Sequence, residues 1–567
     1  MSRSIDISET HKEIVQAILR EHLTNTCHVW VFGSRATWLA KEYSDLDLAI
    51  ARKDGTALSL TVTSALETAF EDSLLPWKVD VVDLHSVSEE FRAAIERDKV
   101  LFSLGVGGEW ITTTIGELCK KVVTGGTPLK SNKAFYLNVQ IPWLKTKEVN
   151  FCRIYETENH ISEIAVRTTS AKLIPINSVI VAMYGQGDTA GRVAVNKIPL
   201  TTNQACCNLI IDEKKANYLF VYFYLKLSYK ELVRRKTGSA QPNLNTNIIK
   251  TFEIKIPSLE VQNKIAHILG TLDDKIELNR QTNQTLEAMA QALFQSWFVD
   301  FDPVIDKALA AGNEIPEAFQ AKAAARKALG DQRLALPEEV TALFPDSFVF
   351  TEEMGWVPEG WEISTLESII SEVIDNRGKT PPLASSESYI YPLVEVNSLN
   401  DGNRFFDNYS IKKHVNKNTY DNWFRKGHPK KGDVLISTVG SIGKVCLVDD
   451  EQCCIAQNII ALRGRSKDYG YYLYELLKYQ KEKLINLDIS SVQPSIKVPH
   501  LMKMKILDGH HLHKKFANIV YIYSEKYKKN QTQTGYLASI RDTLLPNLIS
   551  GELRVADAGG FLGEISV

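Results

Sequence analysis

The sequence predicts a multidomain α/β (α+β) protein with a pseudo-twofold architecture. A small N-terminal domain is expected to precede two mixed α/β domains, which two long antiparallel coiled-coil helices separate. Three observations support this: a length of 567 residues, a strand-rich first hundred residues, and a tandem repeat over the remainder. At about 150 residues per domain, the length alone corresponds to about four domains.

The composition is that of a soluble globular protein, with 44% hydrophobic and 24% charged residues. No run of 18 apolar residues occurs, so we expect no membrane span and a cytoplasmic location. Eight cysteines without a C-x-x-C spacing indicate reduced, mostly buried thiols.

The net charge of −2 hides two regions of opposite sign. Residues 1–105 carry 11 Lys+Arg against 17 Asp+Glu, and the rest carries 55 against 51. The small positive excess of the second region is compatible with an ordinary solvated surface. Any DNA-binding face must therefore come from local placement of charge.

The first hundred residues begin with a helix, predicted over 8–23 from apolar residues spaced like one helical face. The strand-like CHVWVF follows and ends at Gly33 and Ser34. A strand that enters a Gly-Ser turn and a following helix presents backbone N–H groups to an anion. The turn is thus a candidate phosphate site.

Three aspartates follow on predicted strands. In DLDLAI, the spacing of Asp45 and Asp47 places both carboxylates on one face, while Leu46 and Leu48 point into a core. The strand WKVDVVDLH supplies Asp80. Oxygen ligands beside a phosphate-binding turn predict a Mg²⁺ site for phosphoryl transfer. The alternative is that paired aspartates simply end a strand at the surface.

This G-S-x10-D-x-D arrangement with a third strand-borne acid resembles the minimal nucleotidyltransferases of the DNA polymerase beta superfamily, over about residues 10–105. The resemblance implies that Asp80 also activates the attacking hydroxyl. A fold whose activity has decayed is the alternative. The implied sets are Gly33, Ser34 and Arg35 for the nucleotide, with Arg35 on a phosphate, and Asp45, Asp47 and Asp80 for metal and catalysis.

The remainder of the chain is a tandem duplication. Three matches recur at offsets of 251 or 252: the motif that starts at Trp110 with that at Trp361, Gln241-Pro242 with Gln493-Pro494, and 272–286 with 523–537.

Each copy holds short β-rich runs broken by Gly-rich turns, 185–192 and 440–444, and clusters of basic residues. Glycine there allows close approach of a nucleic-acid backbone, or only of a neighbouring strand. Solvated basic surface is the alternative for the clusters. The candidate DNA contacts are Arg192, Arg234, Arg235, Lys236, Gln241, Arg425, Lys426, Lys444 and Gln493.

Both copies end in a heptad seam that predicts a coiled-coil pair. The first seam covers 261–296, which spans ~54 Å as a helix and exceeds one DNA turn of ~34 Å. On a pseudo-twofold axis equivalent residues approach each other, so we expect Asn279 to meet Asn530. The seam positions that are polar in both copies are Lys275, Asn279 and Thr282, with Lys526, Asn530 and Gln533. The alternative is that the two helices separate there, so that these positions are polar because they face solvent.

Residues 108–560 resemble the specificity subunits of type I restriction-modification systems. The resemblance rests on IPSLEVQNKIAHILGTLDDKIELNRQTNQTLEAMAQALFQSWFVDFDPV, on the LFPDSFV…GWVPEGW junction and on TLLPNLISGEL. It implies two target recognition domains, each reading half of a bipartite asymmetric site in double-stranded DNA. It also implies two methyltransferase subunits on the helices, and restriction subunits. The subunit itself is then non-catalytic, and S-adenosylmethionine and ATP are used only by partners.

The extra N-terminal domain departs from that family. It is either an enzyme that transfers a nucleotide to a protein or an inactive docking, regulatory or antitoxin-like module. For the repeat, the alternative is a structural adaptor that binds protein. A Gly-rich linker is predicted at 103–109. The predicted domains are 1–105, 106–258, 259–350 (central helix and linker), 351–510 and 511–567 (C-terminal helix).

Overall fold

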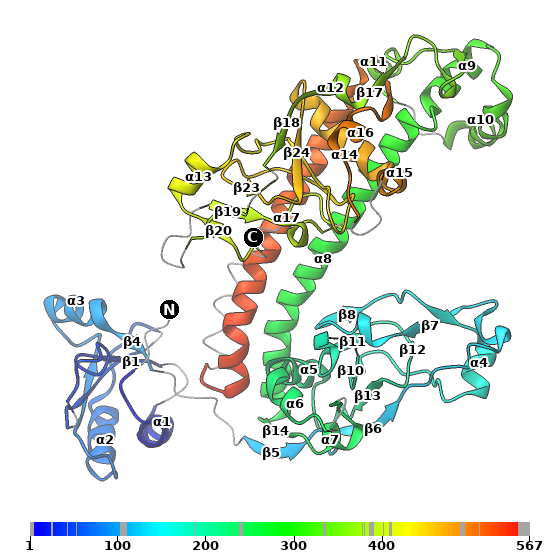
Figure 1. Cartoon of the computed structure of the whole chain (residues 1–567). Coiled ribbons are helices and arrows are strands. Elements are labelled where there is room, and N and C mark those ends of the chain that lie inside the picture. The colour runs from blue at the N-terminus through cyan, green and yellow to red at the C-terminus, as the bar shows by residue number, and fades with distance from the viewer. Residues whose placement is uncertain are drawn as a thin grey trace. The chain divides into compact units, whose positions relative to one another are not determined.

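The structure is a computed structural model that forms two compact units, each described here by itself: Met1–Asp274 with Ala538–Val567, and Lys275–Leu537 (Figure 1). None of its described helices is long and apolar enough to cross a membrane. The predicted linker at 103–109 lies outside the described residues. The structure describes residues 5–23, 27–41, 43–52, 54–102, 110–185, 187–237, 242–332, 336–376, 378, 380–384, 391–400, 402–406, 411–487, 494–509 and 511–553.

The N-terminal domain is a four-stranded sheet with helices on both faces (Figure 1). The strand order is β3-β2-β1-β4. The elements are α1 (Glu9–His22), β1 (Cys27–Phe32), β2 (Leu46–Arg52), α2 (Leu60–Glu71), β3 (Val79–Asp83), α3 (Glu89–Asp98) and β4 (Val100–Leu101).

Alternation along β2 decides which face of the sheet each residue occupies. Leu46 and Leu48 are fully buried in one core with Val15 of α1, as predicted. Ala49 belongs to a second core with Ile95 of α3. The odd-numbered residues of β2, which include Asp47, therefore lie on the α3 face.

The first repeat domain, residues 110–256, contains three sheets, ordered β6-β13-β10-β11-β8, β12-β7-β9 and β14-β5. The elements are β5 (Ile111–Thr114), β6 (Cys119–Thr124), η1 (Lys133–Tyr136), β7 (Ile141–Leu144), η2 (Thr146–Glu148), β8 (Cys152–Ile154), β9 (His160–Ile161), α4 (Glu163–Thr168), β10 (Val179–Ala182), η3 (Gly187–Thr189), β11 (Val193–Asn196), β12 (Thr201–Thr202), β13 (Cys206–Ile211), α5 (Tyr218–Leu227), α6 (Tyr229–Arg234), α7 (Thr246–Lys250) and β14 (Glu253–Ile256).

The second repeat domain, residues 361–509, has sheets ordered β18-β24-β21-β22, β20-β19-β23 and β17-β25. Its elements are β17 (Glu362–Thr365), α12 (Leu366–Ile369), β18 (Ile370–Asp375), β19 (Tyr391–Val394), η6 (Val396–Ser398), β20 (His414–Val415), α13 (Lys417–Trp423), β21 (Val434–Ser437), β22 (Val445–Leu447), β23 (Cys454–Ile455), β24 (Ile459–Gly464), α14 (Lys467–Tyr479), α15 (Lys481–Asn486), α16 (Val498–Met502) and β25 (Lys505–Asp508).

The two domains share their strand order, except that an isolated parallel bridge between Phe405 and Leu447 stands in the second domain where β8 pairs with β11 in the first. In each large sheet, β10 pairs antiparallel with β13 as β21 does with β24. In each small sheet, β7 lies parallel to β12 and antiparallel to β9, as β19 does to β23 and β20. The predicted duplication is thereby confirmed at the level of topology.

A connecting segment between α8 and the second repeat domain contains α9 (Asp302–Ala311), α10 (Glu317–Leu329), η4 (Gly330–Gln332), α11 (Glu338–Thr341), β15 (Phe348–Thr351) and β16 (Gly355–Pro358).

The two long helices, α8 (Leu259–Phe298) and α17 (Leu512–Ser550), pack antiparallel, as predicted. Asn279 Nδ2 lies 3.0 Å from Gln533 Oε1 and 3.4 Å from the Asn530 carbonyl oxygen. Asn530 Nδ2 donates to Asn283 Oδ1 at 2.9 Å, and Asn283 donates to the Tyr527 carbonyl. The residue numbers of the partners on α17 fall as those on α8 rise, which is the pattern of an antiparallel pair. The predicted meeting of Asn279 with Asn530 is confirmed.

The other seam positions need correction. Lys526 is exposed, and the Thr282 hydroxyl donates to the Leu278 carbonyl of its own helix, while Lys275 is half-buried. Tyr527 is buried where the heptad count had placed Lys526. Steps of three and of four residues both keep to one helical face, and the count took three residues from Tyr523 where four reach the buried position.

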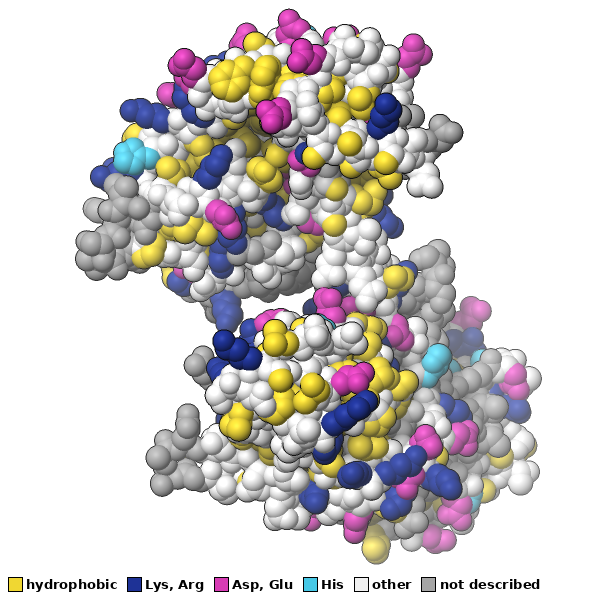
Figure 2. All heavy atoms as spheres, turned by 90° about the vertical axis from the view of Figure 1, so that its right-hand side faces the viewer, with side chains coloured by type: hydrophobic (Ala, Val, Ile, Leu, Met, Phe, Trp, Pro, Cys, Tyr) yellow, Lys and Arg dark blue, Asp and Glu magenta, His cyan; other side chains and the backbone are white. Residues whose placement is uncertain are grey.

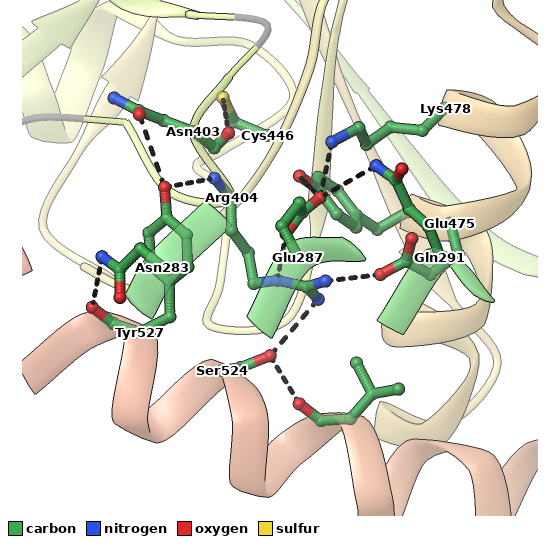
Figure 3. Close-up of polar contacts among 12 residues, drawn as sticks. Asn283, Glu287, Gln291, Asn403, Arg404, Cys446, Glu475, Lys478, Ser524 and Tyr527 are labelled. Atoms are coloured by element: carbon green, nitrogen blue, oxygen red, sulfur yellow. Dashed lines mark hydrogen bonds and ion pairs between the residues drawn. The ribbon is translucent and has the colours of Figure 1, made fainter. Parts of the chain in front are cut away.

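A buried charge cluster attaches the second repeat domain to both helices (Figure 3). Arg404, 1% exposed, donates from Nε to Glu287 of α8 at 2.9 Å and from Nη2 to Glu475 of α14 at 2.5 Å. Its Nη1 lies 3.3 Å from the hydroxyl of Ser524 on α17. Lys478 also reaches Glu287 at 2.5 Å. Two cations and two carboxylates thus neutralise one another inside the protein, as buried charges require.

Candidate functional site

The predicted acidic site lies on adjoining strands of the N-terminal domain. Asp47 is the register partner of Phe32 on antiparallel β1 and of Asp80 on parallel β3. Gly33 follows Phe32 with φ +73°, and a Cβ atom built there would lie 2.5 Å from Asp47 Oδ2. Only glycine suits this position on both counts. The Gly-Ser turn and two of the three acids are thereby brought together.

The carboxylates share a strongly negative environment. Burial raises the pKa of Asp47 above its ordinary range, and the charges of Asp80 and Asp45 raise it further. A divalent cation would relieve this repulsion, and carboxylate oxygens are the ligands that Mg²⁺ prefers. Lys78, which sequence reasoning missed, now pairs with Asp80 at 2.6 Å. In the described part of the chain, no three His, Cys, Asp or Glu side chains form a ready metal cluster. The ammonium of Lys78 would compete with a cation for the Asp80 carboxylate.

The predicted helix after the Gly-Ser turn is wrong. The residues from Gly33 to Trp38 form turns, in which Thr37 N donates to the Gly33 carbonyl at 3.2 Å and Leu39 N to the Ser34 carbonyl at 2.9 Å. Trp38 takes φ +59°, a left-handed conformation that ends the turn. An anion at Gly33 and Ser34 would therefore face a tight turn rather than the first turn of a helix.

Arg35 does not occupy the phosphate-facing position that the sequence predicts. It is 6% exposed, and its guanidinium donates to the backbone carbonyls of Ser44, at 2.7 and 3.0 Å, and of Asp6, at 2.9 Å. It also lies 4.4 Å from the centroid of the Trp77 ring. The arginine braces the loop that leads to Asp45.

Among the candidate DNA contacts of the first repeat domain, two arginines contact other residues of the same domain. Arg192 donates to the Asp188 carbonyl and to Asn150 Oδ1, and Arg235 pairs with Glu231 at 2.7 Å. Both brace their own domain as the structure stands. Arg234 is exposed and Lys236 half-buried, beside Arg235 in the chain, and Gln241 lies outside the described residues.

The second repeat domain exposes Arg425 and Lys426, directly after α13. Lys444 is half-buried, with Nζ 3.5 Å from the Val396 carbonyl oxygen. The backbone N–H of Gly440 donates to the Pro494 carbonyl at 3.0 Å, which brings the Gly-rich turn to the Gln-Pro segment. Gln493 itself lies outside the described residues.

Two family matches cover most of the chain. Residues 107–288 and 358–507 match the family described as type I restriction modification DNA specificity domain. This match covers more than half of the chain, which belongs to that family. Residues 13–104 match the family described as polymerase beta, nucleotidyltransferase. The chain is a type I specificity subunit with an N-terminal nucleotidyltransferase-like domain.

Individual relatives agree with this division. The MjaIX specificity subunit of Methanocaldococcus jannaschii is 26% identical over 77% of this chain and 92% of its own length. The HindI specificity subunit of Haemophilus influenzae is 29% identical over 61% of this chain and 80% of its own. A protein of the same bacterium named "Probable protein adenylyltransferase MntA" is 42% identical over 93 residues, 16% of this chain and 79% of that protein.

Proposed function

We propose that each repeat domain reads one half of a bipartite, asymmetric site in double-stranded DNA. In this proposal the chain works in the cytoplasm with two methyltransferase subunits and with restriction subunits, which alone use S-adenosylmethionine and ATP. The observation that carries the proposal is the repeated fold, joined to antiparallel helices whose equivalent residues Asn279 and Asn530 meet. In this proposal the two copies of one fold act as separate readers, each on its own half of the site.

The methylation pattern of genomic DNA tests this proposal. The chain is expressed with its methyltransferase subunits, and modified adenines are mapped by sequencing. We expect a motif of two specific parts with a spacer of fixed length. Binding of unrelated and motif-bearing duplexes with equal affinity, together with an unmodified genome, would instead favour an adaptor that binds protein.

For the N-terminal domain we propose transfer of a nucleoside monophosphate from a nucleoside triphosphate to a protein hydroxyl, with release of pyrophosphate and with Mg²⁺ held by Asp45, Asp47 and Asp80. The contact between Gly33 and Asp47 supports it, because a phosphate bound at this turn would lie beside the carboxylates that hold the cation. The polypeptide's own task is to position the triphosphate and the acceptor hydroxyl.

Labelled nucleoside triphosphates, Mg²⁺ and the partner subunits provide the test. Asp45→Asn and Asp47→Asn should abolish labelling, since each removes a negative charge from cation coordination, and should leave DNA binding unchanged. The matched control is Asp72→Asn, at an exposed carboxylate just beyond α2. A double variant that labels its acceptor at the wild-type rate would refute the assignment.

The ion pair between Lys78 and Asp80 favours a second candidate, an inactive docking module. In an active enzyme, Lys78→Ala frees Asp80 and should preserve or increase labelling at low Mg²⁺. A docking module should label nothing with or without Lys78, while removal of residues 1–102 should weaken assembly with the partner subunits.

A further inference from the structure

The first repeat domain contains a cavity of about 660 Å³ at the edge of its small sheet. Its lining includes residues from η1, from the end of β7 and from the segment directly before β9. This volume falls in the range of small-molecule sites, about 300–1,000 Å³. In the lower half of Figure 2, lysine and arginine side chains lie among hydrophobic ones on this end of the domain. The side chains that matter here are Lys130, Lys133, Tyr136, Trp143, Lys145 and Asn159.

The cavity combines positive charge with fixed aromatic rings. Three lysines line it, and no carboxylate is among the described residues of its lining. The Trp143 ring is held by a hydrogen bond from Nε1 to the Gly126 carbonyl at 3.0 Å, and the Tyr136 hydroxyl donates to the Pro128 carbonyl at 2.8 Å. Rings anchored in this way present a preformed apolar wall.

One lysine is also held in place. Lys145 Nζ donates to Asn159 Oδ1 at 2.9 Å and lies 5.1 Å from the centroid of the Trp143 ring. Lys130 and Lys133 are exposed at the side chain. The site thus offers fixed rings and an amide beside ammonium groups that remain accessible to an anion.

The second repeat domain has a cavity at the matching place but with different chemistry. It measures about 390 Å³ and is lined from the end of β19 and from η6. Leu393 stands where the first domain has Trp143, and Glu395 where it has Lys145, each counted from the end of the equivalent strand. The basic and aromatic character therefore does not follow from the shared fold.

We propose that the cavity of the first repeat domain binds one nucleoside phosphate unit. The base would stack on Tyr136, Asn159 would offer hydrogen bonds to its edge, and Lys130 and Lys133 would bind the phosphate. Aromatic stacking with lysine contacts is the chemistry by which proteins hold unpaired nucleotides. The inference deepens the proposed reading of DNA, because the unit is either a base unstacked from the bound site or a free nucleotide.

The test uses the full chain with its methyltransferase subunits, in an Asp45→Asn/Asp47→Asn background with EDTA, so that the N-terminal domain does not contribute. The cavity variant is Lys130→Ala/Lys133→Ala/Tyr136→Ala. The control is Lys172→Ala/Lys214→Ala/Tyr155→Ala, which removes the same charges and an equal ring from exposed positions of the same domain. A milder variant, Lys130→Gln/Lys133→Gln, guards against a folding defect.

Two probes separate the sources of the ligand. Duplexes with 2-aminopurine at successive positions report an unstacked base by a rise in fluorescence, and AMP binding is measured by calorimetry. We expect one of these signals in the wild type, weakened about 10-fold or more in the cavity variant and unchanged in the control. Absence of both signals, or equal loss in the control, would overturn the inference. If the duplex is not bound at all, the proposed reading of DNA fails, and the AMP measurement still decides on the cavity.

Discussion

Arg153 and Arg404 occupy equivalent positions in the two repeat domains, 251 residues apart, and both contact a long helix. Arg404 is enclosed by Glu287, Glu475 and Ser524. Arg153 donates to the Gly270 carbonyl at 3.1 Å and pairs with Asp274, whose side chain is 67% exposed. The same residue thus makes a buried ion cluster in one copy and a partly solvated pair in the other.

This difference shows that duplication preserves a contact while its energetics diverge. An ion pair with an exposed partner contributes about 0–1 kcal/mol. Loss of one member of a buried pair leaves an uncompensated charge and costs about 3–5 kcal/mol. At this position the second domain contacts its helices through a buried cluster that is costly to break, whereas the first domain has an ion pair that water partly screens.

The largest expected effect comes from an exchange of one domain. Replacing residues 361–507 by the same region of a relative should change one half of the methylated motif and leave the other half intact, because base contacts carry the sequence information. Binding to the original site should fall to the non-specific level, about 10³-fold or more weaker. Methylation mapping and gel shifts measure both. A change in both halves would mean that the domains do not act independently.

Single substitutions compare the two attachments directly. Glu287→Ala should lower the free energy of unfolding by about 3–5 kcal/mol, because Arg404 and Lys478 lose their shared partner. Asp274→Ala, the matched change at Arg153, should lower it by less than about 1 kcal/mol. Urea unfolding, followed by the fluorescence of the aromatic core, provides the measurement. Equal effects of the two variants would remove the asymmetry inferred here.

In the seam between α8 and α17, unlike at Arg153 and Arg404, the equivalent residues of the two copies contact each other. Asn279→Leu/Asn530→Leu should raise stability by about 1 kcal/mol, since apolar contact replaces a buried polar layer while Asn283 and Gln533 lose partners. The register should become less specific, and a slip of one heptad moves a helix by ~10 Å, about three base pairs. The spacer of the methylated motif should then vary in length. A stabilised variant with an unchanged spacer would show that register is set elsewhere.

The smallest expected effect is a dependence on pH that only the second domain shows. Burial raises the pKa of Glu475 from its ordinary 4.5 to about 7. The folded state therefore binds a proton more tightly than the unfolded one, and this contribution to stability is lost as pH rises from about 4.5 through 7. The melting temperature of the wild-type protein should fall by roughly 2–4 °C more than that of Glu475→Gln between pH 5 and pH 8. Parallel curves would show that Glu475 does not titrate there.

The sequence predicts the fold well where periodicity is local. The strands around Val29 and Leu48, the duplication, and the antiparallel helices all follow from spacing. Errors occur where a single residue breaks the pattern. No propensity foresees Trp38 at a positive φ. The heptad count chooses Lys526 rather than the buried Tyr527, because steps of three and of four residues both keep to one helical face.

The acidic site is predictable in its residues but not in their partners. Asp47 and Asp80 lie on neighbouring strands in register, a pairing that the sequence alone did not give. The burial of Arg35 against Trp77 depends on residues 42 positions apart, and local pattern gives no sign of it. Lys78 had a usable signal, since it lies two residues before Asp80 on the same side of an extended segment.

The cluster around Arg404 limits how such genes can recombine. An exchanged second domain brings its own Arg404, Glu475 and Lys478, whereas Glu287 belongs to a helix that precedes the exchanged segment. A chimera therefore inherits both cations and Glu475 from the donor, and Glu287 from the recipient. Only donors whose buried charges match the recipient helix should yield a folded hybrid, so new specificities should spread preferentially among lineages that share this electrostatic match.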